Sequence, residues 1–260
     1  KMVEEARSLI RQGDMFQCVL SQRFSAEYSG RPLDYYRNLR VTNPSNYLYF
    51  YDFGDYQIIG ASPESLVSVK KGQVTTNPIA GTRPRGKDER EDKALAEELL
   101  ADEKEVAEHR MLVDLGRNDI GKIAQNKSVE ITKYMEVEYF RYVMHLTSVV
   151  RGQLLPQLTA MDALKSTLPA GTVSGAPKIR AMKRIYELEQ EKRGVYAGAI
   201  GYLSATGDMD FAIAIRTMIL KNGRAYVQAG AGIVYDSIPA NEYQETINKA
   251  KSMTKIGEMQ

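Results

Sequence analysis

The chain has 260 residues and a hydrophobic content of 43%, which is enough for a large core in one domain or in two smaller ones. Its 35 basic and 33 acidic residues are interspersed, so no basic stripe indicates nucleic-acid binding and no acidic tail indicates a histone-like partner. Cys18 is the single cysteine and excludes an intrachain disulfide, and without a signal peptide or a long apolar run we expect a soluble, cytoplasmic protein.

The first residues predict an amphipathic helix over residues 2–12. Because the chain begins on Lys1 directly inside this helical pattern, we expect it to be a fragment whose N-terminal part is missing. The elements predicted next are a strand (16–24), a helix (32–42), a hairpin (47–53 and 57–61) and two strands that continue the same sheet (66–69 and 74–76). No internal repeat or low-complexity linker is visible, so we expect one compact domain over residues 1–260.

The middle of the chain carries a paired-carboxylate motif on a predicted helix. The elements predicted here are a loop rich in Pro and Gly (78–86), a long helix (90–113), a turn (114–119), two extended segments (129–134 and 142–151) and a helix (159–167). Glu105 and Glu108 lie at i and i+3 of the long helix and therefore share one face.

Residues 168–178 form a Gly-rich loop that leads into a helix predicted over 177–192. The free backbone N–H groups and the dipole at such a helix start favour an anion. The loop lacks the G-x-x-x-x-G-K-[S/T] pattern of a phosphate-binding loop. An ordinary helix start, with Thr172 or Ser174 as the N-terminal cap, explains the same residues.

Residues 195–234 predict three antiparallel strands with turns at 205–208 and 222–223. The second turn is Asn-Gly, the strongest short hairpin signal. In the last strand Gly230 and Gly232 lack side chains, which indicates close approach of a ligand or of another backbone.

Two polar residues stand on segments that are otherwise apolar. Arg216 lies in a strand predicted over 211–220, where an Arg either pairs with a buried acid or binds an anionic ligand. His145 has the apolar neighbours typical of a core histidine, and the residues around it do not by themselves indicate a base.

The last helix is predicted from about residue 239, with Pro239 near its first turn. On it, Glu242, Glu245 and Lys249 fall at i, i+3 and i+7 and share one face. A solvated charged face explains one such stripe. Two helices that each offer a pair of carboxylates could instead hold one hard divalent cation such as Mg²⁺, which prefers oxygen ligands.

Taken together, these segments resemble the chorismate-utilising enzymes, and among them the large subunits of anthranilate synthases. The resemblance runs nearly end to end and rests on motifs in the family's order. These motifs are Phe16-Gln17-Cys18-Val19-Leu20-Ser21-Gln22, Ala61-Ser62-Pro63-Glu64, residues 78–86, residues 108–115, residues 172–178, Gln228-Ala229-Gly230-Ala231-Gly232 and residues 241–250. Each motif alone is weak, and their joint order is specific.

The resemblance implies an α+β fold with two large antiparallel sheets packed together and helices on the outside. It implies Mg²⁺ that clamps the ring carboxylate of chorismate and is bound directly or through waters by Glu105, Glu108, Glu242 and Glu245. The substrate-binding residues that it implies are Gly81, Thr172, Tyr196, Arg216, Gly230, Gly232 and Lys249. The catalytic residues that it implies are Glu64, His145 and Thr82.

The implied chemistry is the amination of chorismate followed by loss of pyruvate, which yields anthranilate. Hydroxide is a poor leaving group, so Glu64 is expected to protonate the departing C4 hydroxyl. The nucleophile is expected to be ammonia, supplied from solution or by a separate glutamine amidotransferase subunit, because Cys18 lies in a strand without a nucleophile-elbow context. The N-terminal region that contributes to tryptophan feedback in the family is expected to be absent.

Other readings of the residues remain open at this point. Aminodeoxychorismate synthases carry a Lys where this chain has Ala80, and isochorismate and salicylate synthases carry a water-activating Lys where it has Gln17. A synthase that stops at the aminated intermediate is harder to exclude. A non-catalytic binding or scaffold paralogue is the alternative outside the enzymes, although such a protein needs none of these site residues.

Overall fold

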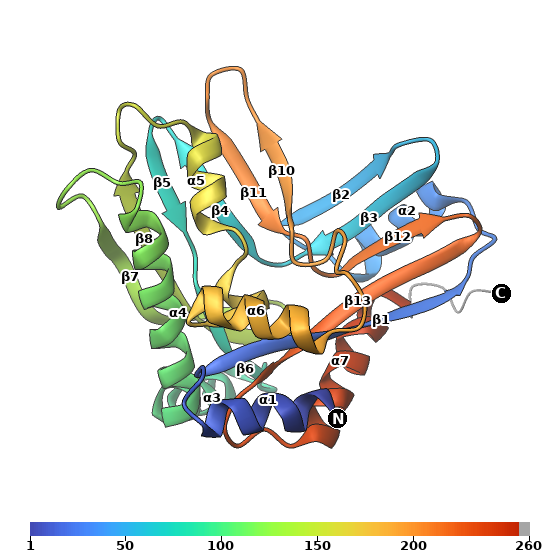
Figure 1. Ribbon diagram of the computed structural model, residues 1–260, viewed down its shortest axis with the longest axis horizontal. Coiled ribbons are helices and arrows are strands. Elements are labelled where there is room, and N and C mark those ends of the chain that lie inside the picture. The colour runs from blue at the N-terminus through green and yellow to red at the C-terminus, as the bar shows by residue number, and fades with distance from the viewer. Residues whose placement is uncertain (255–260) are drawn as a thin grey trace. The chain divides into compact units, whose positions relative to one another are not determined.

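The computed structural model describes residues 1–254, which form two compact units. Unit 1 comprises Lys1–Glu64, Pro169–Ile200 and the chain from Ala212 onward, and unit 2 comprises Ser65–Leu168 and Gly201–Phe211. Over the described residues the chain has two antiparallel sheets and seven α-helices (Figure 1), which confirms the predicted α+β class. One domain spanning residues 1–260 stays a prediction.

Unit 1 contains a six-stranded sheet in the order β2-β3-β12-β13-β1-β9 (Figure 1). Its strands are β1 (Gln17–Glu27), β2 (Tyr47–Asp52), β3 (Tyr56–Ser62), β9 (Gly175–Ala176), β12 (Thr217–Lys221) and β13 (Arg224–Ile233). The long strands β1 and β13 pair from Cys18 opposite Ile233 to Glu27 opposite Arg224. This pairing places the residues around Gln17 beside the Gly-rich end of β13.

Four helices pack on the sheet of unit 1: α1 (Met2–Arg11), α2 (Pro32–Thr42), α6 (Lys178–Leu188) and α7 (Pro239–Thr254). Leu39 of α2 and Met253 of α7 are fully buried in one apolar cluster with Met218 of the sheet. A second cluster joins α1 and α6 to β1 through Ala6 and Ile185, among others. Burial of these apolar faces fixes the helices that carry several predicted site residues.

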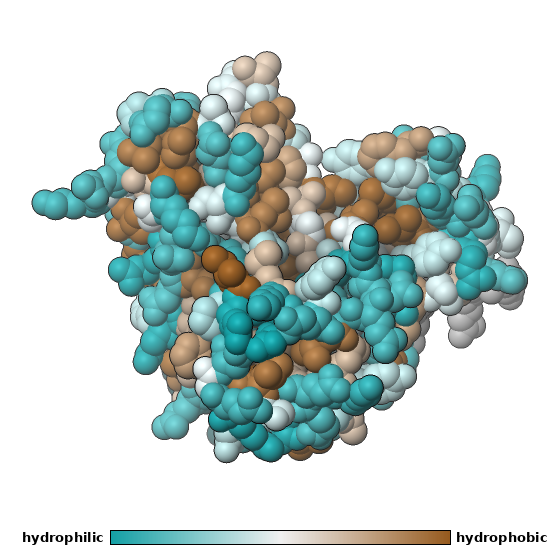
Figure 2. All heavy atoms as spheres, viewed as in Figure 1, coloured by the Kyte–Doolittle hydropathy of each residue, from teal (hydrophilic) through white to brown (hydrophobic). Residues whose placement is uncertain are grey.

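The outward side of α6 is mainly basic but exposes apolar side chains as well. Ile179 and Tyr186 are each 84% exposed, and Met182 is 42% exposed. In Figure 2 the surface over α6 is largely teal with a brown apolar spot among the hydrophilic side chains. Scattered exposed apolar residues of this kind are normal on a folded domain.

Unit 2 contains a sheet in the order β10-β11-β4-β5-β8-β6, with β7 paired to β8. Its strands are β4 (Ser65–Lys70), β5 (Gln73–Thr76), β6 (Ile79–Pro84), β7 (Glu130–Tyr139), β8 (Val143–Gln153), β10 (Ala199–Leu203) and β11 (Met209–Ile213). Its helices are α3 (Glu89–Ala101), α4 (Glu103–Gly121) and α5 (Ala160–Thr167). Within the unit, α4 is tied to β8 by the ring of His109, whose Nε2 lies 2.6 Å from the Ser148 hydroxyl.

Three predictions about the segment 78–121 are wrong. The expected loop at 78–86 contains strand β6, an edge strand in which Pro84 comes last and removes no needed donor. The expected helix over 90–113 is two helices, because Asp102 ends α3 and caps α4 by accepting from the backbone N–H groups of Lys104 and Glu105. The predicted turn at 114–119 therefore lies inside α4.

The strands after residue 195 also differ from the prediction. They are four and belong to two sheets, since β10 and β11 pair in one and β12 and β13 in the other. Arg216 does not lie in a strand but in the break between β11 and β12, with a positive φ of 49°. Strands β4 and β5 likewise do not continue the sheet of the hairpin β2-β3.

Helix α6 is shorter than the predicted 177–192, and neither residue considered as its cap in the alternative reading of the loop caps it. Pro177 is the N-cap residue, and Thr172 belongs to a short 3₁₀ turn, Gly171–Val173. The Ser174 hydroxyl donates to the carbonyl oxygen of Ala170 instead of capping the helix, 2.7 Å away. The helix ends at Leu188, so the residues after it form a loop. No helix within residues 1–254 has the length and apolar character needed to cross a membrane.

Candidate active site

The Glu64 carboxyl of unit 1 is a candidate acid. Glu64 follows β3, and its carbonyl oxygen accepts a hydrogen bond from the backbone N–H of Ile213 at 3.0 Å. The residue is half-buried and its carboxyl is poorly solvated. This desolvation raises the pKa of Glu64 from 4.5 to about 7, against the smaller lowering effects of Thr172 and Lys249. A substantial fraction of Glu64 is therefore protonated near neutral pH.

The Thr172 hydroxyl is a buried polar group beside the Glu64 carboxyl. It lies near enough to the Glu64 carboxyl to lower that pKa, but its Oγ1 atom makes no regular hydrogen bond with any described residue. Buried hydroxyls are normally hydrogen-bonded, because an unsatisfied one costs about 1–3 kcal/mol. The side chain is thus placed to bind a ligand next to Glu64.

Tyr196 and Gly230 fit each other within unit 1. A Cβ atom on Gly230 would lie 2.5 Å from the Tyr196 hydroxyl, so a side chain there would displace the ring. Burial raises the pKa of Tyr196 to about 12, which keeps its hydroxyl protonated as a hydrogen-bond donor. Gly230 is therefore needed for close approach, as the sequence predicted.

Arg216 is held by helix α7. Its Nη1 atom donates to the carbonyl oxygen of Lys249 at 2.9 Å and to the Ser252 hydroxyl at 2.7 Å. Burial lowers the pKa of the guanidinium, which nevertheless stays charged because arginine loses its proton only at extreme pH. Since neither partner is a carboxylate, Arg216 retains a positive charge for an anionic ligand.

Gly232 makes room for Gln17. A Cβ atom on Gly232 would lie 2.7 Å from Nε2 of Gln17, a side chain that is 95% buried since its exposed fraction is 5%. The Gln17 amide thus lies against the Gly-rich end of β13, so a side chain approaches Gly232 where the sequence pattern predicted a ligand or another backbone. It is neutral at every working pH.

The carboxylates of α7 lie beside a lysine. The Nζ atom of Lys249 is 2.6 Å from Oε1 of Glu245 and donates to the carbonyl oxygen of Gly230 at 3.0 Å. Glu242 is half-buried on the same helix, whereas Glu245 is exposed. The predicted stripe of two carboxylates and one ammonium is present within unit 1.

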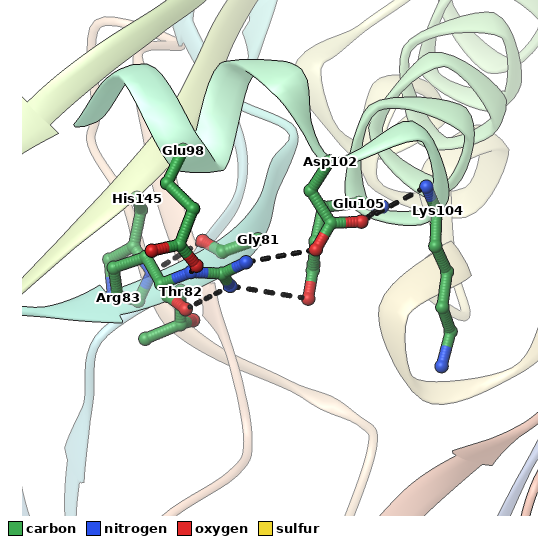
Figure 3. Close-up of polar contacts among 8 residues, drawn as sticks. All are labelled: Gly81, Thr82, Arg83, Glu98, Asp102, Lys104, Glu105 and His145. Carbon is green, nitrogen blue, oxygen red and sulfur yellow. Dashed lines mark hydrogen bonds and ion pairs between the residues drawn. The ribbon is translucent and has the colours of Figure 1, made fainter. Parts of the chain in front are cut away.

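In unit 2, Gly81, Thr82 and His145 form a second group (Figure 3). Nδ1 of His145 lies 3.1 Å from the carbonyl oxygen of Gly81 and 3.0 Å from the Thr82 hydroxyl. Because a carbonyl oxygen only accepts, Nδ1 carries the proton and Nε2 is the basic nitrogen. Burial lowers the pKa of His145, while the Gly81 contact and Glu138 act in the opposite direction, so the ring is neutral at pH 7. Gly81 has φ +77°, at a register shift of β6 that aims its carbonyl at the ring.

The second carboxylate pair lies on α4. Glu105 and Glu108 are both half-buried. Burial raises the pKa of Glu105, and the negative charges of Glu108 and Asp102 raise it further. Like charges held together in this way favour a bound cation.

Arg83 is a residue at this group that the sequence analysis did not single out. Its guanidinium spans Glu98 at 2.9 Å, Asp102 at 2.8 Å and Glu105 at 3.8 Å, and it donates to the Thr82 carbonyl oxygen at 3.0 Å (Figure 3). It therefore links the strand of Thr82 to the start of α4. The available signal was an Arg inside a motif-bearing segment, but its carboxylate partners lie on α3, at the helix break at Asp102 and on α4.

The predicted site residues are thus distributed over both units. Unit 1 carries Glu64, Thr172, Tyr196, Arg216, Gly230, Gly232, Glu242, Glu245 and Lys249, and unit 2 carries Gly81, Thr82, Glu105, Glu108 and His145. Within residues 1–254 no group of three or more His, Cys, Asp or Glu side chains is arranged as a ready metal site. The carboxylate pairs suit a cation such as Mg²⁺, which keeps several waters and takes few protein ligands.

Comparison with known proteins identifies the family. The chorismate binding enzyme family matches residues 1–255 of the chain. The anthranilate synthase component 1 of Lactococcus lactis subsp. lactis is 63% identical over 256 residues, which are 98% of this chain and 56% of that protein.

Two solved structures have the same fold. The crystal structure of anthranilate synthase component I from Streptococcus pneumoniae TIGR4 has a TM-score of 0.92 at 83% identity, over 97% of this chain and 56% of that one. The menaquinone-specific isochorismate synthase of Escherichia coli has a TM-score of 0.89 at 26% identity, over 98% of this chain and 59% of that one. The chain spans about half the length of the curated relatives it matches.

Proposed function

The chain belongs to the chorismate-binding enzymes, and from this premise we propose that it converts chorismate and ammonia to anthranilate and pyruvate, in tryptophan biosynthesis. The observation that carries the proposal is the pair formed by Glu64, with its pKa of about 7, and the Thr172 hydroxyl beside it, which acts on the carboxyl but makes no hydrogen bond of regular geometry. An acid that is partly protonated at neutral pH, beside an unused hydrogen-bonding group, suits a reaction that expels hydroxide.

Glu64 acts as the general acid. In the proposed reaction ammonia adds at C2 of the ring, the double bonds shift, and the C4 hydroxyl leaves as water after it receives the Glu64 proton. Glu64 becomes a carboxylate in this step. Its desolvated surroundings, which raise its pKa, favour the return of the proton for the next turnover.

Tyr196 and Arg216 bind the enolpyruvyl carboxylate. The Tyr196 hydroxyl is kept protonated by burial, and neither hydrogen-bond partner of the Arg216 guanidinium is a carboxylate. The Gly-rich end of β13, with Gly230 and Gly232, lets the ring approach the backbone. These groups orient the substrate for proton transfer.

His145 assists the elimination of pyruvate. Its Nδ1 proton is directed to the Gly81 carbonyl oxygen, which leaves Nε2 as a base that is neutral at pH 7. Loss of the ring C2 proton together with the enolpyruvyl group yields the aromatic ring of anthranilate. Thr82, in contact with the same imidazole, helps to hold its orientation.

Mg²⁺ is the proposed cofactor, and two carboxylate pairs, Glu105 with Glu108 on α4 and Glu242 with Glu245 on α7, are each proposed to offer ligands to it, directly or through waters. When bound, it supplies a Lewis acid for the ring carboxylate of chorismate. Lys249 adds a positive charge beside Glu245. Burial, and to a smaller extent the charges of Glu108 and Asp102, raise the pKa of Glu105, and a bound cation would offset both effects.

A separate glutamine amidotransferase is the proposed source of ammonia. Cys18 does not provide a glutaminase nucleophile, because burial raises the pKa of its thiol to about 12 and leaves almost no thiolate. The buried Gln17 amide has no basic form that could activate water, so the pocket favours ammonia over water. This residue separates the proposed reaction from that of a water-using chorismate enzyme.

The proposed function is tested by the appearance of anthranilate fluorescence when chorismate, Mg²⁺ and an ammonium salt are added to the protein. Glu64→Gln is the matched loss-of-function variant, and Glu187→Gln, an exposed carboxylate on α6, is the control. Fluorescence from the wild type and the control but not from Glu64→Gln is the expected result. A wild type that leaves chorismate unchanged contradicts the proposed enzyme activity and favours a non-catalytic paralogue.

A further inference from the structure

The loop that follows α6 contains an ion pair that touches three parts of unit 1. Arg193 donates through Nε and Nη2 to the two oxygens of Glu189, at 2.8 and 2.7 Å. The Glu189 side chain is 6% exposed and the Arg193 side chain 17% exposed. A bidentate and largely buried pair of this kind has little freedom to move.

The two remaining hydrogen bonds of the guanidinium are with the backbone. Nη1 donates to the carbonyl oxygen of Val173 at 2.6 Å, and Nη2 donates to the carbonyl oxygen of Val19 at 2.7 Å. Val173 directly follows Thr172, and Val19 lies on β1 two residues after Gln17. The guanidinium carbon also lies 5.3 Å from the centre of the Tyr196 ring.

Glu189 extends the same network into the sheet. Its Oε1 atom accepts from the backbone N–H and from the hydroxyl of Ser21, each at 2.8 Å. The Ser21 hydroxyl in turn accepts from Nε2 of Gln228 on β13 at 2.8 Å. The pair is therefore anchored on β1 and, through Ser21, on β13. It holds Val173, which follows Thr172, and it contacts the Tyr196 ring directly.

We propose that Arg193 and Glu189 are positioning residues that set the location of Thr172 and of the Tyr196 ring for chorismate. This inference rests on the proposed function and assigns a role to a pair that touches no reacting atom. The fork of Arg193 holds the Val173 carbonyl oxygen, and the Thr172 hydroxyl on the preceding residue faces the Glu64 carboxyl without a hydrogen bond of regular geometry. A lysine at position 193 keeps the charge but cannot make the four directed contacts.

The decisive experiment is a double-mutant cycle between Arg193→Lys and Thr172→Val. Arg193→Lys should lower kcat/KM at least about tenfold, because a misplaced binding group weakens the transition-state complex. Thr172→Val should cost the wild type clearly more than it costs the Arg193→Lys variant, because Thr172 is already misplaced there. Strictly additive losses would overturn the proposal, since a purely structural pair does not act through Thr172.

The matched control is Glu191→Gln. Glu191 lies in the same loop and pairs with Arg23 of the same strand β1, but its side chain is 65% exposed. Its loss should change kcat/KM by less than about twofold, as for other surface pairs. A control that loses as much as Arg193→Lys would mean that loop attachment in general, and not this pair, is what matters.

A second variant tests the proposal in case Arg193→Lys does not fold. A second readout, the position of Thr172, tests it even if the proposed function is wrong. Glu189→Met combined with Arg193→Met replaces the pair by apolar side chains, a change that buried ion pairs often tolerate. In a crystal structure of either variant, Thr172 should move relative to Glu64 by about 1 Å or more, a displacement large enough to impair catalysis. An unmoved Thr172 overturns the inference whatever the activity, whereas an inactive wild type contradicts only the proposed function.

Discussion

Lys249 forms a 2.6 Å ion pair with Glu245, one turn earlier on α7. The pair holds one of the proposed Mg²⁺ ligands beside a positive charge. Glu245→Gln removes the ligand charge, so Mg²⁺ together with a benzoate anion should raise the Tm of the wild type but not of this variant. Removal of groups that only support metal ligands lowers activity up to about a hundredfold. Removal of a ligand should therefore lower activity at least about a hundredfold.

The exposed Glu187 on α6 provides the control for that prediction. Glu187 is also paired with a basic residue, Arg184, but carries no proposed ligand role. Glu187→Gln should retain both the Tm shift and the activity. Turnover of Glu245→Gln within a few-fold of the wild type in Mg²⁺ would show that the metal assignment is wrong.

The pKa of Glu64 predicts the pH dependence of the reaction. Because a general acid must be protonated, kcat/KM should decline as pH rises above about 7. The supply of NH₃ acts in the opposite direction, since ammonium loses its proton as pH rises. The decline is therefore measured at a constant concentration of free NH₃. A rate that stays flat from pH 6 to pH 9 under this condition would exclude Glu64 as the acid.

Glu64 should also affect stability. Its pKa is raised on folding from 4.5 to about 7. The protonated form therefore adds to the free energy of unfolding, fully below pH 4.5, and this addition is lost as pH rises to about 7. The loss should be about 1–3 kcal/mol and absent in Glu64→Gln. Urea unfolding of both proteins at pH 5 and pH 8 measures the difference. Equal pH dependence of the two proteins would contradict the raised pKa.

His145 should contribute to kcat through Nε2. His145→Gln retains an amide donor for the Gly81 carbonyl oxygen but has no base at the Nε2 position. Steady-state kinetics should show a loss of about 10²–10⁴-fold in kcat with little change in Tm, as for other general bases. Full activity of His145→Gln would show that the histidine is not a base and only supports Gly81.

Arg216→Lys should reduce kcat/KM by about 2–4 kcal/mol, because lysine lacks the planar fork that binds a carboxylate. The structure adds a competing role, since the Arg216 side chain also ties α7 through Lys249 and Ser252. Ser252→Ala, which loses one of these ties, separates the two roles. If Ser252→Ala alone reproduces the catalytic loss at an equal Tm, Arg216 acts through α7 and not on the substrate.

Most helices and strands could be predicted from the sequence, because local patterns determine them. Helix α2 has the predicted bounds, and the hairpin turn at Asn222 and Gly223 lies where the Asn-Gly signal placed it. Apolar periodicity and turn chemistry act over a few residues and are visible in one chain. The assignment of strands to two sheets is a tertiary property, which is why β4, β5, β10 and β11 were misassigned.

The site residues could be predicted from sequence motifs, whereas the contacts that these residues make in the fold could not. Arg216 was expected inside an apolar strand, because its neighbours are apolar, but the chain breaks there with a positive φ. Arg83 was missed because its carboxylate partners are distant in sequence, and Arg193 because its contacts with the backbone carbonyls of Val173 and Val19 are tertiary. A basic residue in an ordinary charged segment carries no local signal for such a role.

The most direct test of the account is product analysis by chromatography with and without ammonium. With chorismate, Mg²⁺ and an ammonium salt, the protein should form anthranilate and pyruvate in equal amounts. Without ammonia it should form neither isochorismate nor salicylate, because the buried Gln17 amide cannot take a proton from water. Isochorismate or salicylate as the main ammonia-free product would contradict the account and assign the protein to the water-using chorismate enzymes.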